Sequence, residues 1–126
     1  MLCAQRLTLQ AFRKSVVYSA MMIDEIRVKI AQGLFEFSKH AVDQSLLRHI
    51  SVQEVREAMD TGEIIEDYPN DKYGPSCLIF GWTTTNRPLH LQCSYPSRPL
   101  LKIITLYEPD VGSWLNFKVR KAPDAN

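Results

Sequence analysis

Residues 63–107 decide the fold, and they read EIIEDYPNDKYGPSCLIFGWTTTNRPLHLQCSYPSRPLLKIITLY. Within this stretch the hydrophobic period approaches two, and Pro and Gly residues separate four short runs. The runs cover residues 63–68, 77–83, 89–95 and 100–107. The loops between them are short enough to join antiparallel neighbours. We therefore expect a four-stranded antiparallel meander.

Helix signals lie before this region. Asp24 is a candidate cap for a first helix, whose apolar residues follow a spacing of three and four. Ser38 can cap a second helix over residues 39–48. Ser51 and Glu54 form a capping box at the start of a third, because each side chain can bind the other residue's backbone N–H.

Helices followed by strands predict an α+β domain, with two to three N-terminal helices packed on one face of a four-stranded antiparallel sheet. Residues 34–37 are expected to be a short extended link. We expect a single domain over residues 24–114. Residues 1–23 are then an extension outside the domain, with Met21 or Met22 as the working start, and residues 115–126 a tail.

Composition excludes several classes of protein. The chain has 126 residues and a formal net charge of +1, which excludes a histone-like polycation. The longest uncharged run, residues 73–86, is too short and too polar to span a membrane. Three cysteines without a CxxC pair predict neither a disulfide framework nor a zinc site. A cytoplasmic protein without a membrane partner is expected.

Charge is distributed unevenly along the chain. Residues 24–86 carry a formal charge of −5, whereas residues 1–23 and 87–126 carry +3 each. If an anionic ligand is bound, this asymmetry predicts that it lies on the later strands; the alternative is that the charges only form solvated faces.

The sheet face away from the helices is a candidate contact surface. If the loop at residues 84–88 is centred on Asn86, the side chains of Leu78, Phe80 and Trp82 lie beside that of His90 on one face. An apolar strand flanked by polar residues on such a face is typical of a binding surface.

The histidines are the residues best suited to proton transfer near neutral pH. His40 lies in the first turn of a helix and His90 on a central strand. His49 lies beside a turn, where a solvated side chain is expected. No self-sufficient catalytic motif is present, and the spacing of the histidines and carboxylates predicts no metal site and no cofactor.

Six ordered blocks between residues 37 and 110 carry a resemblance to a known family. They are FSxHA from Phe37, RxISxxEV from Arg48, GEIIExYPxDK from Gly62, PSxL from Pro75, RPLH from Arg87 and IITxYxPD from Ile103. With these blocks the chain resembles a bacterial family of domains of unknown function, DUF4258. The resemblance implies the RelE/ParE-like toxin fold. The chain departs from the family pattern at two positions: the family usually has an arginine where this chain has Gln44, and a glycine where it has His49.

The resemblance implies a toxin of a toxin–antitoxin pair that acts as a metal-independent mRNA endonuclease. Its partners would be RNA or the ribosome and an antitoxin, of the MqsA-like zinc-finger kind. Such chemistry needs a base, an acid and cations. The matching polar positions give the candidate site: His40, His90 and Tyr107 for catalysis, Arg48, Lys72 and Arg87 for RNA phosphate, and the adjacent Tyr73 for base stacking.

Two other functions remain open at this point. The chain could be a non-catalytic module that holds a partner protein on the face containing Phe80. It could also be a degenerate toxin fold with a regulatory role.

Overall fold

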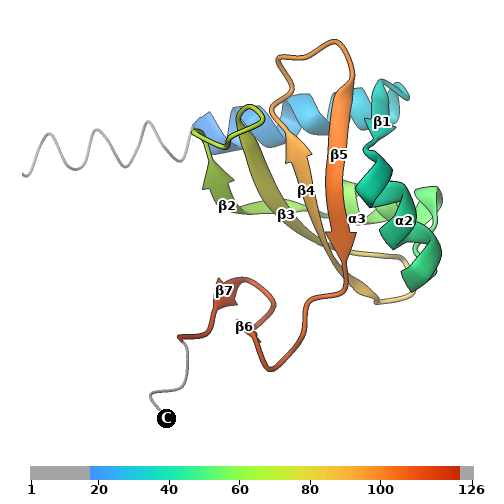
Figure 1. The fold of residues 1–126 in the computed structure, drawn as a ribbon, viewed down its shortest axis with the longest axis vertical. Coiled ribbons are helices and arrows are strands. Elements are labelled where there is room, and N and C mark those ends of the chain that lie inside the picture. The colour runs from blue at the N-terminus through green and yellow to red at the C-terminus, as the bar shows by residue number, and fades with distance from the viewer. Residues whose placement is uncertain (1–17, 123–126) are drawn as a thin grey trace, which may run out of the picture.

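The computed structural model describes residues 18–122, which form a mixed five-stranded sheet backed by helices (Figure 1). The strands are β1 (Phe35–Phe37), β2 (Glu63–Tyr68), β3 (Ser76–Trp82), β4 (Pro88–Ser94) and β5 (Leu101–Tyr107), in the spatial order β1-β5-β4-β3-β2. Strands β2 to β5 form the expected antiparallel meander, each within a residue of its expected bounds. The α+β class is therefore confirmed.

The prediction of a four-stranded, purely antiparallel sheet was wrong, because the segment expected to be a link, residues 34–37, contributes a fifth strand. In β1, Phe35 pairs with Leu101 and Phe37 with Ile103, parallel to β5. Two of the helices and the strands β2 to β4 lie between β1 and β5 in the sequence, so they make the long connection that a parallel pair requires. Without β1, β5 would be an open edge of the sheet.

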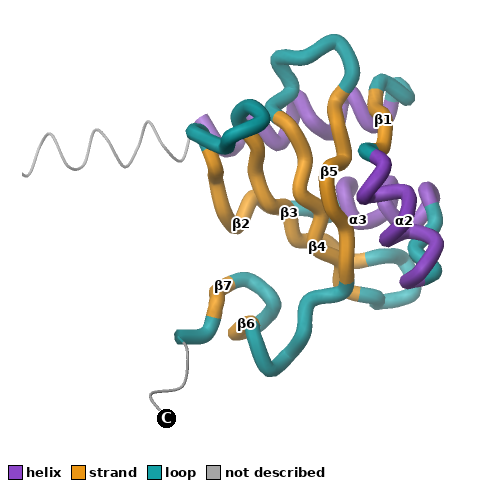
Figure 2. The backbone as a smooth tube through the Cα atoms, viewed as in Figure 1, coloured by secondary structure: helices purple, strands orange, loops and turns teal. Residues whose placement is uncertain are grey.

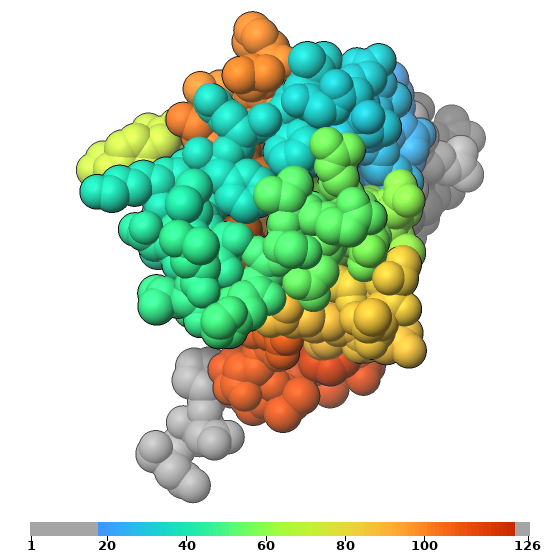
Figure 3. All heavy atoms as spheres, turned by 90° about the vertical axis from the view of Figure 1, so that its right-hand side faces the viewer, coloured from blue at the N-terminus to red at the C-terminus, as the bar shows by residue number. Residues whose placement is uncertain are grey.

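Three helices pack on one side of the molecule (Figure 3). The first covers residues 18–31 of the described chain, and α2 (Lys39–Arg48) and α3 (Val52–Asp60) follow. The predicted caps of the last two are present: the Ser38 hydroxyl accepts the Ala41 N–H at 3.0 Å, and Ser51 and Glu54 form the capping box.

Asp24 does not cap the first helix. It lies within that helix, because residues 18–23 are already helical, and Met22 is buried in the core. Part of the segment expected outside the domain therefore carries part of the fold. Residues 1–17 lie outside the described residues.

The core fills the space between these helices and one face of the sheet. Its members are Met22, Ile26, Ile30, Ala41, Ile50, Val55, Ala58, Met59, Cys77, Ile79, Leu89, Leu91, Cys93, Leu101, Ile103 and Leu106. At its centre α3 crosses β3 at Gly81, where a Cβ atom would lie 1.8 Å from the Ala58 carbonyl oxygen. A glycine is needed there because only it lets the helix backbone approach the strand so closely.

The C-terminal segment folds back over the other face of the sheet instead of forming a tail. It contains a two-stranded hairpin, β6 (Trp114–Leu115) and β7 (Val119–Arg120), after the loop that follows β5 (Figure 2). The hairpin turns at Asn116 and Phe117, both with positive φ, and the Lys118 N–H donates to the Leu115 carbonyl at 3.0 Å. These angles match a type I′ turn, whose twist suits a short hairpin. The expected tail at 115–126 was therefore wrong over residues 115–120, and residues 123–126 lie outside the described residues.

Candidate functional site

His90 and Tyr107 form a hydrogen-bonded pair at the centre of the sheet face that the hairpin covers. They are direct cross-strand partners on β4 and β5, and the His90 Nδ1 lies 3.1 Å from the Tyr107 hydroxyl. The His90 Nε2 lies 2.6 Å from the Phe117 carbonyl oxygen. Because a carbonyl can only accept, Nε2 carries the proton and Nδ1 accepts the Tyr107 O–H. The fold therefore selects one tautomer of His90.

Aromatic rings enclose this pair. The Trp114 ring stands edge-on to the His90 ring, with centroids 4.4 Å apart, and the Phe117 ring stacks on Phe80 at 5.8 Å. His90 is fully buried, whereas Tyr107 is half-buried and forms the outward side of the pair.

Burial sets the protonation of both groups. It lowers the pKa of His90 below the ordinary value, although the hydrogen bond to Phe117 and the charge of Glu66 act in the opposite direction. Burial also raises the pKa of Tyr107. The pair is therefore a neutral imidazole beside a neutral phenol at pH 7.

A salt bridge between Glu66 and Arg120 closes the hairpin over the site. Arg120 Nε lies 2.9 Å from a Glu66 carboxylate oxygen, and the Tyr68 hydroxyl donates to the same carboxylate. Burial would raise the pKa of Glu66, but the hydrogen bonds from Arg120 and Tyr68 outweigh it and lower the pKa. Glu66 thus supplies a stable negative charge near His90.

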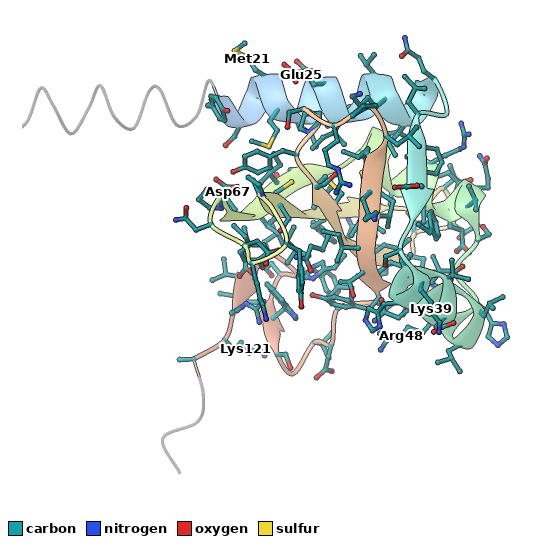
Figure 4. All side chains as sticks on the ribbon, turned by 45° about the horizontal axis from the view of Figure 1, so that its top comes forward. Met21, Glu25, Lys39, Arg48, Asp67 and Lys121 are labelled. Carbon is teal, nitrogen blue, oxygen red and sulfur yellow. The ribbon has the colours of Figure 1, made fainter. Side chains whose placement is uncertain are left out.

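Arg48 is the candidate cation that the structure brings to the pair. It lies exposed in the last turn of α2, near the end of β5 (Figure 4), with its guanidinium carbon 6.0 Å from the Tyr107 ring centroid. The sequence-predicted residues His90, Tyr107 and Arg48 therefore form one cluster.

Arg87 lies next to this cluster, but its donors are engaged within the protein. Its guanidinium donates to Glu54 at 3.0 Å, to Glu108, and to the carbonyls of Arg48 and His49 at 2.8 Å each. Burial would lower the pKa of Arg87, but these carboxylates raise it. Arg87 therefore uses four of its five N–H donors on two carboxylates and on the C-terminal carbonyls of α2, which leaves one donor for any phosphate.

The other predicted residues lie away from the pair. His40 is exposed in the first turn of α2, and no hydrogen bond or ion pair within residues 18–122 joins it to the cluster. Lys72 and Tyr73 lie on the loop between β2 and β3, at the opposite end of the strands, with the Lys72 Nζ 5.4 Å from the Tyr73 ring centroid.

Gln44, one of the two departures from the family pattern, links α2 to β5. Its side-chain oxygen accepts the Thr105 hydroxyl and the Leu106 N–H, both at 2.9 Å. An arginine has no acceptor and could not make these bonds. The glutamine therefore has a structural role here.

Sequence reasoning missed Trp114, Phe117 and Arg120, because it assigned most of their segment to a tail. The available signal was local: an aromatic, apolar stretch around Asn116, a residue that favours positive φ. Within residues 18–122, no group of three or more His, Cys, Asp or Glu side chains is placed to hold a metal ion, and no helix there is long and apolar enough to cross a membrane.

Of three comparisons with known proteins, only the one with family sequence patterns finds a match. The family whose sequence pattern matches is described as a domain of unknown function, DUF4258, and the match covers residues 37–108. No curated protein and no solved structure matches the chain. The match spans more than half of the chain and includes α2, α3, the strands β2 to β5 and the last residue of β1, so the chain belongs to the DUF4258 family.

Proposed function

We propose that this protein is the toxin of a toxin–antitoxin pair and cleaves RNA by proton transfer through Tyr107 and His90. The observation that carries the proposal is the fixed tautomer of His90, whose basic Nδ1 faces the hydroxyl of a half-buried tyrosine. A hydroxyl held by a base, which is itself oriented by a third group, is the usual arrangement for moving a proton in catalysis.

In the proposed reaction the Tyr107 oxygen takes the proton of a ribose 2′-OH while its own proton moves to His90 Nδ1. The 2′ oxygen attacks the adjacent phosphorus and the bond to the 5′ oxygen breaks, leaving a 2′,3′-cyclic phosphate. Water protonates the departing 5′ oxygen and becomes hydroxide, which takes a proton from the Tyr107 hydroxyl while His90 Nδ1 returns its proton to the tyrosine. The imidazolium is stabilised by the Phe117 carbonyl and Glu66, and Arg48 neutralises charge on the phosphate.

The test is cleavage of single-stranded RNA by the purified protein, alone and on ribosomes. Tyr107→Phe and His90→Gln are expected to slow cleavage by about 10²- to 10⁴-fold, and cleavage is expected to persist in a chelator. Tyr95→Phe, which removes a hydroxyl bonded to Asp67, and His49→Asn are the matched controls. Tyr107→Phe cleaving RNA at the rate of the unaltered protein would overturn the proposal.

The catalytic role of His40 stays a prediction that the same assay tests. Because His40 is exposed and no hydrogen bond in the described chain joins it to Tyr107 or His90, His40→Ala is expected to slow cleavage less than His90→Gln.

The toxin role is tested in cells. Expression of this chain is expected to arrest growth, and co-expression of the antitoxin, proposed to be a small zinc-finger protein from the neighbouring gene, is expected to relieve the arrest. Arrest that persists in Tyr107→Phe would separate the growth effect from RNA cleavage.

A non-catalytic protein-binding module is the second candidate, because α2 exposes apolar side chains. Val42, Leu46 and Leu47 are 42%, 71% and 79% exposed. The face first considered for a partner, around Phe80, is filled by Phe117. This candidate, like a degenerate toxin fold with a regulatory role, predicts a stable complex with the neighbouring gene product but no growth arrest.

A further inference from the structure

A groove that contains both charged and apolar side chains lies on the same sheet face as His90, at the opposite end of the strands. It is bounded by the loop before β3 and the loop before β5 and has a volume of about 620 Å³. The residues that matter for a ligand are Tyr73, Ser94, Arg98 and Lys102. This volume is within the range of sites that hold small molecules or parts of larger ligands.

The walls of the groove are held in place by contacts from outside it. The Tyr95 N–H donates to the Pro75 carbonyl at 3.1 Å, which ties the two loops together. Lys29 Nζ donates to the carbonyls of Arg98 and Pro99 at 2.7 and 3.0 Å, which fixes the second loop to the first helix. The groove is therefore preformed.

Two cations in the groove are available to an anion. Among residues 18–122, the Arg98 guanidinium has no hydrogen-bond acceptor or carboxylate partner, and Lys102 has only Glu36 at 3.7 Å. The carboxylate that also lines the groove, Asp71, already accepts the Ser76 hydroxyl at 2.8 Å. The positive charge of the groove is thus only partly offset, which suits a phosphate group.

The groove also offers a hydroxyl donor and an aromatic ring. Ser94 is buried at the floor, where its oxygen accepts the Lys102 N–H at 2.9 Å and leaves its own proton free to donate. Tyr73 is 84% exposed at the edge, with Lys72 beside its ring. Exposed aromatic rings beside cations are the usual platforms for the bases of single-stranded nucleic acid.

Strand geometry connects the groove to His90. Ser94 and His90 are four residues apart on β4, so their side chains point to the same face about 13 Å apart along the strand. A ligand in the groove that also reaches Tyr107 must therefore be a chain longer than one nucleotide.

We infer that this groove binds a nucleotide of single-stranded RNA, with the phosphate at Arg98 and Lys102 and the base stacked on Tyr73. The inference rests on the proposed function, because the nucleotide in the groove would belong to the same RNA molecule that Tyr107 and His90 cleave.

The experiment measures binding of a fluorescent 2′-O-methyl RNA 12-mer, which lacks the free 2′-OH that cleavage needs, by fluorescence anisotropy over a range of salt concentrations. Tyr73→Ala is expected to weaken binding about tenfold, and Tyr73→Phe to restore it. Removing both cations, Arg98→Ala with Lys102→Ala, is expected to reduce the magnitude of the slope of log K against log[salt] by about 0.7, since the one phosphate held between them contributes about 0.7 on a single strand.

The matched control is Arg56→Ala, which removes an arginine on α3, behind the other face of the sheet. It is expected to leave the salt slope unchanged. The inference is overturned if the groove variants bind the RNA as the unaltered protein does, or if a poly-glutamate peptide competes for the groove as well as the RNA.

The two proposals fail separately. If the groove variants weaken binding but unmodified RNA is not cleaved, the groove assignment stands and the ribonuclease proposal fails. If RNA is cleaved while the groove variants bind and cleave normally, the groove assignment alone fails.

Discussion

His49 ends α2 in the left-handed region, with φ 53°. A residue with a Cβ atom costs about 1–2 kcal/mol in this region. Glycine avoids that cost, but it loses more backbone entropy on folding, which offsets part of the gain. The backbone angle therefore favours glycine at this position.

His49→Gly is expected to raise the free energy of unfolding by about 0.5–1 kcal/mol and the Tm by about 4 °C. Urea denaturation and thermal melting measure both values. His49→Ala is the control, because alanine keeps the Cβ atom that clashes in this region. Equal stability of the glycine and alanine variants would show that the angle costs nothing.

His90 gives the fold a dependence on pH that follows from its burial. Its pKa is lowered in the folded protein, whereas in the unfolded chain it is about 6.5. Between these two values the unfolded chain binds more protons, so stability rises with pH there and is lost as the pH falls below about 6.5. Glu66 and Arg120, the charged groups near His90, stay charged in this window.

The free energy of unfolding, measured in urea at pH 7.5 and 5.5, is therefore expected to fall on acidification. In His90→Gln, which has no titrating group at this position, the fall is expected to be smaller. A variant with the same fall as the unaltered protein would place the titration at another residue.

At the scale of elements, Arg87 joins the end of α2, the start of α3 and the end of β5. Its partners are the carbonyls of Arg48 and His49, Glu54 at the capping box, and Glu108 beyond β5. The carbonyls at the end of a helix lack partners within the helix, and a guanidinium at this position satisfies two of them.

Arg87→Ala is expected to lower the free energy of unfolding by about 2 kcal/mol, because the partly buried Glu54 and two helix-end carbonyls lose their donor. Urea denaturation measures the loss. Arg87→Lys is expected to recover only part of it, since one ammonium cannot reach all four acceptors. Full stability of Arg87→Ala would contradict the structural role and reopen a role in phosphate binding.

At the scale of the whole molecule, the C-terminal hairpin makes a second, smaller layer over the open face of the sheet. Trp114 is buried against the His90 ring, and the Arg120 guanidinium carbon lies 4.7 Å from the centroid of its indole. Phe117 accepts a positive φ of 63° although it is bulky, a strain that its ring packing and its bond to His90 offset. The hairpin is thus part of the site and not an appendage.

Trp114→Ala is expected to lower the free energy of unfolding by about 3 kcal/mol and to move the pKa of His90 up toward 6.5, because burial is its main cause. Urea denaturation and an NMR titration of the imidazole measure the two effects. Leu115→Ala, at an exposed position of the same hairpin, is expected to change stability by less than about 0.5 kcal/mol. An unchanged His90 titration in Trp114→Ala would show that the hairpin does not shield the site.

The sequence by itself determined α2, α3 and the strands β2 to β5. Their signals are local: Ser38 and Ser51 cap helices through residues three positions away, and alternating runs between Pro and Gly residues define strands. Because such signals depend only on neighbours in the chain, they can be read without a fold. His90 and Tyr107 were also identified from the sequence, through the family resemblance and the chemistry of their side chains.

Only the tertiary structure decided the rest, because it depends on partners far apart in the chain. β1 pairs with β5 across more than sixty residues, Arg87 reaches carbonyls 38 and 39 positions away, and the Phe117 carbonyl selects the tautomer of His90. The residues next to a short strand or a charged side chain do not indicate its partner, because that partner is determined by packing and hydrogen bonding between distant parts of the chain. For the same reason the sequence predicted a tail at residues 115–126, whereas the hairpin there packs over the candidate site through contacts with distant residues.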